Sequence, residues 1–492
     1  MKNVSNSIKQ VMVVFLFCFV ALISYIAYFQ VFSAPNIAEQ QGNQRLWAKR
    51  NEVLRGTIYD RNKNALTTSA RIDALKQKRT YVNGDLYVHA LGYIDTKYGL
   101  TGLEANYDSD LTNYNKITNN ISNLSKDFSM DKLKQVFKNR KEDEVKIGNG
   151  VITTLDPTLQ KIAYDALGNS KGAVVALNPK TGEVLAMVSK PTYNPNDLEN
   201  SMKAANEGTS DNSPLINRVT SGLYPPGSTF KTVTLSSALD NMSDVTTRTF
   251  NDTGKIVFNE KQSLSNDSGE VNGTINLKEA FRLSSNFVFG TLAMELGNDK
   301  LKTTAEKYGF NNTIDSDGFK MSQSKFPKLT KAEVGSIAQS GIGQSSILAT
   351  PMQMALVSST IANKGKMMEP RLVNQVIDKD GNVVKTIDSN VYKQVISPTN
   401  ANIIKDYMKN LVDSKIDSSW GYFQGTGTAG KTGTADYNLA NGESAKPHSW
   451  FIGFAPANDP KVAVAVIVEN GGYGASAAAP IAGKVINAAL AK

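Results

Sequence analysis

The first long hydrophobic pattern is an unbroken apolar run near the N-terminus. Val11 to Phe29 carry no charge and are rich in Val, Phe, Leu and Ile. At about 1.5 Å of rise per residue, a helix of this length spans a hydrocarbon core about 30 Å thick. Lys2 and Lys9 precede the run without an acidic residue, which predicts a cytoplasmic N-terminus and an extracellular remainder. We therefore expect a cytoplasmic stub at residues 1–10 and a transmembrane anchor at 11–32.

A cleaved signal peptide is the alternative interpretation of this run. Its apolar core would be shorter and would end at a small-x-small cleavage site. Phe32 stands where a small residue would be needed before Ala34. The pattern therefore favours a retained, single-pass anchor in the cell membrane.

Short strand and turn patterns follow between residues 33 and 150. Gly56 and the turn Asn62-Lys63-Asn64 bracket a short alternating strand, and Tyr98–Glu104 is a glycine-punctuated turn that leads into a helix. We expect Asp60 and the nearby arginines, among them Arg55, to form an ion-pair network that fixes the domain orientation. Nothing in this segment indicates catalysis, and its length suits a small, elongated pedestal domain.

Residues 151–492 contain strand patterns at both ends and helical patterns between them. The strand-like segments are Val151–Leu155, Ala173–Leu177, Glu183–Val188, Thr428–Thr434, His448–Phe454 and Val462–Val468. Turn residues at Asn178–Gly182 join two of these segments in a hairpin, and an Ala-rich helix runs from about Pro480 to Leu490. Two strands, a helical region, three strands and a final helix predict an α/β (α+β) domain. Its antiparallel five-stranded sheet should be covered by helices.

A serine–lysine pair opens one of the expected helices. Pro225, Pro226 and Gly227 end the preceding segment, and the pattern from Thr229 to Leu239 predicts a helix. Ser228 falls on its first turn, and Lys231 lies three residues later on the same face. A serine hydroxyl becomes a nucleophile when a neighbour takes its proton, and a lysine can do so if its pKa is lowered. Alone, the pair fits an N-cap and a solvated charge equally well.

Two further short motifs carry polar side chains that could line the same site. Ser284 and Asn286 lie two residues apart and could either point into one cleft or cap a helix. Gly430-Lys431-Thr432-Gly433-Thr434-Ala435 is predicted as a strand, in which Gly433 permits close approach of another backbone. This segment is not a phosphate-binding loop, because that motif lies between a strand and a helix.

Composition removes several other kinds of chemistry. Cys18 is the single cysteine and lies in the apolar run, so neither an intramolecular disulfide nor a cysteine-based zinc site can form. His89 and His448 are the only histidines, which disfavours a Ser-His-Asp triad and a multi-histidine metal site. The net charge of +9 is spread along the chain without one basic block, so nucleic acid is not expected as a partner. We expect no metal and no cofactor.

In their order along the chain, the motifs resemble the signature of a known family. Ser228-Thr229-Phe230-Lys231, Ser284-Ser285-Asn286 and Lys431-Thr432-Gly433 are similar to the motifs of penicillin-binding proteins and serine β-lactamases. Four further stretches are similar to penicillin-binding transpeptidase domains: Asn217-Arg218, Gly341–Gln344, Thr350–Ala355 and Trp450–Pro456.

The N-terminal half refines this resemblance. Arg55-Gly56 with Asp60-Arg61-Asn62 resembles the pedestal of the class B, monofunctional members, and the segment before residue 151 is too short to hold a glycosyltransferase as well. The resemblance implies a pedestal (dimerisation-like) domain at 33–150 and a transpeptidase domain at 151–492. One departure is Lys63-Asn64, where the family usually has a glycine turn; Asn tolerates the same left-handed backbone.

The resemblance also implies the role of each residue. Ser228 would attack the penultimate D-Ala of a peptidoglycan stem peptide and release the terminal D-Ala, with Lys231 as its base. Lys431 would keep Lys231 neutral by like-charge repulsion, and Ser284 would relay a proton to the leaving amine. The remaining implied roles are amide binding by Asn286 and carboxylate binding by Lys431, with Thr432 and Thr434 as hydroxyl donors. Gly433 would belong to the same substrate-binding strand, and the backbone N–H groups of Ser228 and Thr434 would form an oxyanion hole.

The same resemblance implies partners and leaves rival functions open. β-Lactams should acylate Ser228, and a multi-span glycan polymerase of the SEDS type should lie beside Val11–Phe29 and the pedestal. A β-lactamase or D,D-carboxypeptidase would use the same motifs but transfer the acyl group to water. A non-catalytic sensor or scaffold that binds wall fragments is the alternative from a different functional class.

Overall fold

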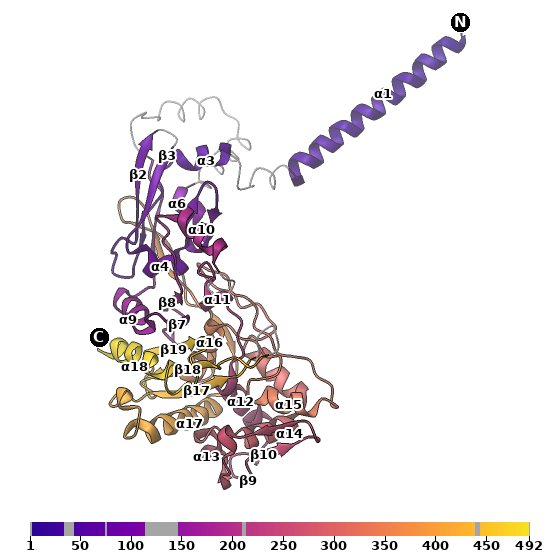
Figure 1. The fold of residues 1–492 in the computed structure, drawn as a ribbon. Coiled ribbons are helices and arrows are strands. Elements are labelled where there is room, and N and C mark those ends of the chain that lie inside the picture. Colours follow the sequence, from indigo (N-terminus) through magenta and orange to yellow (C-terminus); the bar gives the residue numbers. More distant parts are fainter. Residues whose placement is uncertain are drawn as a thin grey trace.

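A computed structural model of the chain describes residues 2–33, 44–73, 76–113, 146–208, 213–437 and 443–491. Its N-terminal element is the long helix α1 (Lys2–Tyr28), which continues into a π-helical turn, η1 (Phe29–Ser33). Figure 1 shows that α1 projects away from the rest of the molecule. The segment Ile8–Tyr28 has a mean hydropathy of 2.6, and its most apolar part is not buried against the rest of the protein. An exposed apolar helix of this length suits a membrane-spanning anchor.

The core of the large domain is a five-stranded antiparallel sheet in the order β17-β18-β19-β7-β8. Its strands are β7 (Gly172–Leu177), β8 (Val184–Lys190), β17 (Ala429–Ala435), β18 (His448–Ala455) and β19 (Val462–Val468). Every residue of β18 and β19 is buried, so helices must cover both faces of the sheet. The predicted sheet and its five strands are confirmed, with strand ends that differ by no more than two residues.

Two groups of helices cover this sheet. One group is α9 (Pro157–Leu167) and α18 (Ala478–Leu490), which pack on each other and on the sheet. The other group is α16 (Pro351–Ala362), buried along its whole length, and α17 (Pro398–Ile416). Figure 1 shows α9 and α18 on the left of the sheet, and α12, α14 and α15 at the lower right.

The helical region between the strand pairs carries the first two motifs. Its elements are α10 (Leu198–Glu207), α11 (Arg218–Ser221), a 3₁₀ turn η2 (Gly227–Phe230), α12 (Lys231–Asn241), α13 (Leu277–Arg282), α14 (Asn286–Lys307) and α15 (Val334–Gly341). The first eight residues of α12 are buried, and this helix packs against α14 and α17. The nucleophile motif is therefore anchored in the core.

This region also contains short strands that the sequence patterns did not predict. They are β9 (Thr249–Asp252), β10 (Lys255–Val257), β11 (Ser263–Ser265), β12 (Gly273–Asn276), β13 (Lys366–Met368), β14 (Val373–Ile377), β15 (Val383–Thr386) and β16 (Val391–Gln394); the short helices η3 (Asp267–Gly269) and η4 (Gly421–Phe423) accompany them. Strands of three to five residues show too little alternation to be recognised from the pattern alone.

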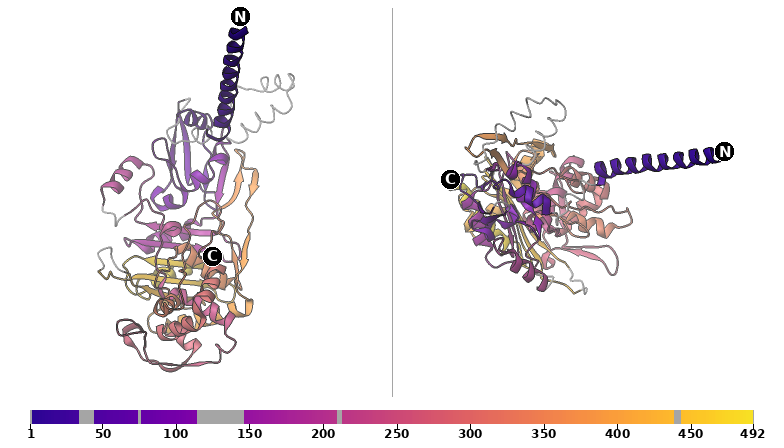
Figure 2. Two further views of the ribbon diagram at one scale, coloured as in Figure 1. Left: turned by 90° about the vertical axis from the view of Figure 1, so that its right-hand side faces the viewer. Right: turned by 90° about the horizontal axis from the view of Figure 1, so that it is seen from above.

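A second sheet, in the order β1-β6-β14-β15, connects the large domain with the pedestal. Strand β6 (Gly150–Thr153) corresponds to the predicted strand at Val151, and it pairs with β1 (Ile58–Tyr59) on one side and β14 on the other. The left view of Figure 2 shows the orange strands of this region running beside the indigo and purple pedestal. The domain boundary at residue 150 stays a prediction, since this sheet crosses it.

The other pedestal elements are small. They are α3 (Gln44–Asn51), β2 (Thr67–Asp73), β3 (Lys76–Tyr81), α4 (Gly84–Leu91), β4 (Ile94–Asp95), β5 (Gly99–Leu100), α5 (Gly102–Asn106) and α6 (Asp108–Thr112). Strands β2 and β3 form a hairpin, and α4 packs on β8 of the large domain.

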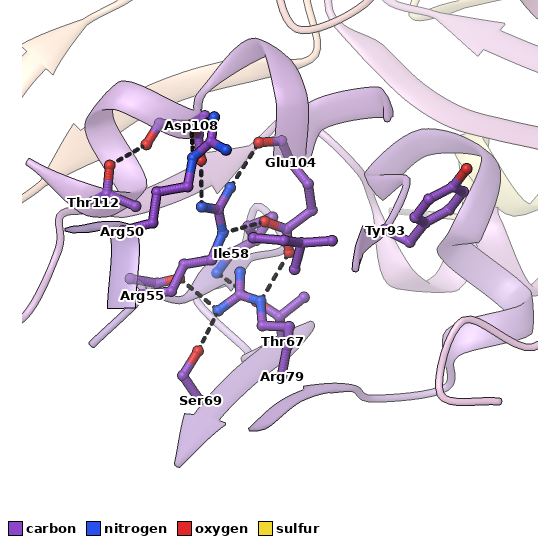
Figure 3. A network of polar contacts seen from close by, with 12 residues as sticks. Arg50, Arg55, Ile58, Thr67, Ser69, Arg79, Tyr93, Glu104, Asp108 and Thr112 are labelled. Atoms are coloured by element: carbon purple, nitrogen blue, oxygen red, sulfur yellow. Dashed lines mark hydrogen bonds and ion pairs between the residues drawn. The ribbon is translucent and has the colours of Figure 1, made fainter. Parts of the chain in front are cut away.

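A buried ion-pair network holds these elements together (Figure 3). Glu104 is completely buried and accepts from Nε of Arg55 at 2.6 Å and Nε of Arg79 at 2.8 Å. Arg55 also binds Asp108 at 2.5 Å, and Arg50 binds the other oxygen of Asp108. Burial alone would raise the pKa of Glu104, but the charges and hydrogen bonds of the two arginines lower it. The carboxylate therefore stays ionised.

The expected role of Asp60 in this network is wrong. Its carboxylate instead closes its own turn, accepting from the backbone N–H of Asn62 at 2.8 Å and from the N–H and side-chain amide of Asn64. The left-handed residue of the turn is Lys63, with φ 65°, and not Asn64. A short acidic side chain that satisfies three local donors can hold a turn without glycine.

Removing the central carboxylate should destabilise the fold. Glu104→Gln leaves two buried guanidinium groups without their shared counter-charge, so we expect a loss of about 3–5 kcal/mol of unfolding free energy. Urea unfolding of the purified protein measures this loss. Asp165→Asn, which breaks the exposed pair of Lys161 and Asp165, is the control and should cost less than about 0.5 kcal/mol. Equal stability of Glu104→Gln and the wild type would show that the network does not stabilise the pedestal.

Candidate active site

The turn that carries Ser228 packs against the end of strand β17. Gly227 has φ 54°, and a Cβ atom there would lie 2.6 Å from the carbonyl oxygen of Thr434. Its N–H donates to the carbonyl of Gly343 at 3.0 Å, and the indole N–H of Trp450 donates to the carbonyl of Pro225 at the same distance. The turn is thus held from three directions, and only glycine fits at position 227.

The predicted helix start needs one correction. Ser228 lies in the 3₁₀ turn η2, which runs directly into α12 at Lys231, and not in the first turn of an α-helix. Such tighter turns are common at helix N-termini. Ser228 remains half-buried, and its hydroxyl has no hydrogen-bond partner in the part of the chain that the structure describes.

The amine of Lys231 is fully buried and bound by the second motif. Nζ lies 2.5 Å from the carbonyl oxygen of Ser284, 2.7 Å from Oδ1 of Asn286 and 3.2 Å from Oγ of Ser284. Two of these atoms can only accept a hydrogen bond. A neutral amine has two N–H groups for them and one lone pair left for a hydroxyl proton.

Electrostatics favours that neutral form. Burial is the largest cause that lowers the pKa of Lys231, followed by the charge of Lys431, and together they place it well below the usual value of 10.5. Asp252 and Asp267 act in the opposite direction. The repulsion by Lys431 is in the expected direction, but burial contributes more.

Ser284 lies between the two lysines. Its Oγ is 2.9 Å from Nζ of Lys431 and 3.2 Å from Nζ of Lys231. Ser284 adopts a left-handed backbone conformation, with φ 58°. The next residue, Ser285, is the N-cap of α14, and its Oγ accepts from the N–H of Val288. The helix cap is therefore Ser285 and not Ser284, and the role of Ser284 as a site residue stays a prediction.

Lys431 reaches Ser284 from strand β17, which forms one edge of the five-stranded sheet. Its amine is buried, and burial together with the charge of Lys415 lowers its pKa to about 7. On the same face, a Cβ atom at Gly433 would lie 2.9 Å from the carbonyl oxygen of Pro226. The missing side chain at Gly433 thus allows the strand to approach the nucleophile turn.

The two threonines of this strand lie on its other face. Thr432 and Thr434 alternate with the buried Lys431 and Gly433 and are half-buried. Oγ1 of Thr434 accepts weakly from the N–H of Gly474 at 3.5 Å. The backbone of Thr434 lies beside Gly227, so the N–H groups expected to form the oxyanion hole belong to adjoining segments.

The amide of Asn286 is engaged inside the protein. Its oxygen accepts from Lys231, and its nitrogen donates to the carbonyl of Ser265 at 2.8 Å. One lone pair and one hydrogen remain for a substrate amide. The expected binding role is therefore compatible with a second role in holding Lys231.

Two further carboxylates support the site without belonging to any motif. Glu469 accepts from Nε of Arg218 at 2.6 Å and from the hydroxyl of Tyr224 at 2.8 Å, four residues before Ser228. Asp252 accepts from Ser285 at 2.7 Å. Neither could be found from the sequence, because single acidic residues far from a motif carry no local pattern.

Metal ions in proteins are commonly bound by clusters of His, Cys, Asp and Glu side chains. Across the described ranges, no group of three or more His, Cys, Asp or Glu side chains could hold an ion. The cationic groups of this site are its two lysines.

Comparison with known proteins identifies the family of both domains. The model of the penicillin binding protein transpeptidase domain matches residues 172–487, and that of the penicillin binding protein A dimerisation domain matches residues 55–132. The peptidoglycan D,D-transpeptidase PbpA of Mycolicibacterium smegmatis is 33% identical over 99% of both chains. The peptidoglycan D,D-transpeptidase MrdA of Acinetobacter baumannii is 28% identical over 81% of this chain and 64% of its own.

Solved structures show the same fold. Penicillin-binding protein A from M. tuberculosis, as a ceftriaxone acyl-enzyme complex, is 30% identical with a TM-score of 0.79, covering 90% of this chain and 100% of that one. Its penicillin G acyl-enzyme complex gives a TM-score of 0.78, covering 89% and 100%. Fold and comparisons thus define a serine-type acyltransferase, a D,D-transpeptidase. The chain belongs to the class B penicillin-binding proteins.

Replacing Lys431 should change how stability depends on pH. A lysine with a pKa near 7 in the folded state and 10.5 when unfolded binds fewer protons when the protein is folded. Its contribution to the free energy of unfolding is therefore fully present above pH 10.5 and is lost as the pH falls toward 7. Wild-type stability relative to Lys431→Met should therefore rise between pH 7 and 10. Thermal unfolding of both proteins at several pH values measures this difference. Parallel curves would show that Lys431 keeps an ordinary pKa.

Proposed function

We propose that this protein is a peptidoglycan D,D-transpeptidase that cross-links stem peptides through an acyl-enzyme on Ser228. The observation that carries the proposal is the position of the Ser284 hydroxyl, within hydrogen-bond distance of both Lys231 and Lys431. Two buried lysines on one hydroxyl form a proton-transfer group, and the nucleophile motif lies on the adjoining turn. The names of the full-length relatives support the same reaction.

Acylation begins with the neutral amine of Lys231. It takes the proton of Ser228, whose oxygen forms a bond to the carbonyl carbon of the penultimate D-Ala. When the tetrahedral intermediate collapses, the carbon–nitrogen bond breaks and the terminal D-Ala leaves as an amine. The proton held by Lys231 passes through the hydroxyl of Ser284, 3.2 Å away, to that leaving nitrogen.

Transfer to the acceptor reverses these steps. An amine of a neighbouring stem peptide attacks the ester carbonyl, loses a proton through the same serine–lysine pair, and releases Ser228 with its hydroxyl restored. One exchange of amide bonds is thereby divided into two easier steps. The intermediate of each step carries an oxyanion, for which the backbone N–H groups of Ser228 and Thr434 are the proposed donors, each worth about 3–4 kcal/mol.

The other site residues would bind the donor peptide. Lys431, Thr432 and Thr434 are proposed to hold its terminal carboxylate, and Gly433 keeps β17 close to the nucleophile turn, so that the peptide can lie beside both. Asn286 is proposed to bind a peptide amide through its remaining hydrogen-bonding capacity. β-Lactams present a strained amide at the same position and should acylate Ser228, as they acylate penicillin-binding protein A in its acyl-enzyme complexes.

Acylation by a β-lactam tests the proposed function directly. We expect intact-mass spectrometry after incubation with penicillin G to show one added penicillin on the wild type and none on Ser228→Ala. Ser221→Ala, at an exposed serine just before the nucleophile turn, is the matched control and should retain the adduct. An undiminished adduct on Ser228→Ala would refute the assignment of the nucleophile. Rapid loss of the adduct with turnover of penicillin would indicate a hydrolase instead.

The exposed helix α1 supports a proposed orientation and partner. Lys2 and Lys9 precede the apolar segment, which favours a cytoplasmic N-terminus and an extracellular catalytic domain. The families that match the chain are a transpeptidase domain and a dimerisation domain. We propose that a multi-span glycan polymerase of the SEDS type binds beside α1 and the pedestal.

Labelling of intact cells tests the orientation. Lys161→Cys places a thiol on an exposed position of α9, and we expect a membrane-impermeant maleimide to label it without cell lysis. The unmodified protein, whose single Cys18 lies in the apolar helix, is the control. Labelling that requires lysis would contradict the orientation.

Failure of the polymerase to co-purify after cross-linking from α1 would contradict the proposed partner.

A further inference from the structure

A buried acidic residue outside all three motifs organises the turn that holds Lys231. Asp252, at the end of β9, is completely buried. Its Oδ1 accepts from the N–H of Gly254 at 2.8 Å and from the amide of Asn266 at 2.9 Å. Its Oδ2 accepts from the amide of Asn272 at 2.6 Å and from the hydroxyl of Ser285 at 2.7 Å. Both carboxylate oxygens are thus saturated by donors from separate segments.

These donors lead directly to the second motif. Ser285, itself 2% exposed, passes the interaction on by accepting from the N–H of Val288 as the N-cap of α14. Asn266 accepts from the N–H of Phe287 at 3.0 Å. The turn between α13 and α14 is therefore held at Ser285 by a carboxylate and at Phe287 by an amide, the residues on either side of Asn286.

We propose that Asp252 is a positioning residue, whose carboxylate fixes the turn that binds the amine of Lys231. The atoms that bind Nζ are the carbonyl and hydroxyl of Ser284 and Oδ1 of Asn286, the residues on either side of Ser285. Ser284 has a left-handed backbone, which a serine rarely adopts without support from its surroundings. Asp252 supplies that support from the strand beneath the turn. This inference rests on the proposed function of Ser228 and Lys231.

Asp252 also contributes to the electrostatics of Lys231. Burial alone would raise the pKa of Asp252, but its hydrogen bonds with Asn272, Ser285, Gly254 and Asn266 lower it, so the carboxylate is ionised. The charges that face Lys231 are Lys431 on β17, Asp252 on β9 and Asp267 on η3. The two carboxylates raise the pKa of Lys231, against burial and Lys431. Loss of either carboxylate should therefore move the acid limb of the acylation profile to lower pH.

Two substitutions separate position from charge. Asp252→Asn keeps the shape of the side chain but turns an NH₂ group toward donors, whichever way the amide is oriented, and thus breaks the support of the turn. Asp267 is exposed, and its charge also faces Lys231. In the described chain its side chain makes no hydrogen bond to Ser284, Ser285 or Asn286, so Asp267→Asn removes the charge without touching the turn. Only the first should disturb the position of Nζ.

The test is the second-order rate constant for acylation of the full-length protein by a fluorescent penicillin, measured from pH 5 to 9. A displacement of catalytic groups by about 1 Å costs about 10²-fold in rate, so Asp252→Asn should acylate about 10²-fold more slowly at its optimum. Asp267→Asn should keep the wild-type maximum and show only the shift of the acid limb. Lys231→Ala, which removes the amine, gives the lower limit of the rate.

Ser285→Ala and Ser285→Thr test the link itself. If Asp252 acts through this hydroxyl, Ser285→Ala should lose a similar factor, Ser285→Thr should recover most of it, and Asp252→Asn should add little to Ser285→Ala. A rate for folded Asp252→Asn within threefold of the wild type would overturn the inference. If Asp252→Asn does not fold, a normal rate for Ser285→Ala would overturn it equally. Absence of acylation in the wild type would instead refute the proposed function.

Discussion

The structure depends on the burial of two lysine amines around one serine hydroxyl. Lys231 and Lys431 are both fully buried, and each lies within hydrogen-bond distance of Ser284. Two buried ammonium groups near one hydroxyl, with no carboxylate in contact with either among the described residues, are costly to keep charged together. Burial therefore lowers the pKa of both amines, and the acceptors around Lys231 match a neutral amine. A neutral lysine next to a serine is a base that needs no histidine.

Close backbone packing brings these groups together. Positions 227, 343, 433 and 474 are glycines at which a Cβ atom would lie within 3.0 Å of another segment's backbone. They allow the nucleophile turn, the edge strand β17 and the loop after β19 to meet without intervening side chains. The motif residues occur far apart in the sequence, and these contacts, with the caps of α14, define their relative positions. Lys231 and Lys431 lie on a helix and a strand of the core, and Ser228 and Ser284 lie on turns that these contacts fix.

Much of this could be predicted from the sequence. Most strands of the main sheet are apolar segments bounded by turns, and the predicted bounds of all five agree with the structure to within two residues. The chemistry of Ser228 and Lys231 follows from their spacing, and the resemblance of the ordered motifs identified the family. Long apolar periodicity and fixed motif spacing are local signals, which a sequence displays directly.

What could not be predicted depends on contacts between distant segments. The short strands β9 to β16 are only three to five residues long, too short for their periodicity to identify them, and the pattern of β6 did not show which sheet it joins. Asp60 closes its own turn, and the arginines instead form ion pairs with Glu104, which the sequence pattern indicates only as part of a turn. The same holds for Asp252, since its carboxylate acts through donors that lie up to 33 residues away. Which charged residues pair with one another depends on the tertiary structure, and the local sequence pattern does not show it.

The central claim is that the amine of Lys231 is neutral when the enzyme is ready to react. Nitrogen-15 NMR of Nζ-labelled lysine, with the Lys231 signal assigned by its loss in Lys231→Ala, measures the protonation state of this amine directly. The account predicts a titration midpoint well below 10.5, the usual value for a lysine. A signal that remains that of an ammonium group up to pH 10 would contradict it.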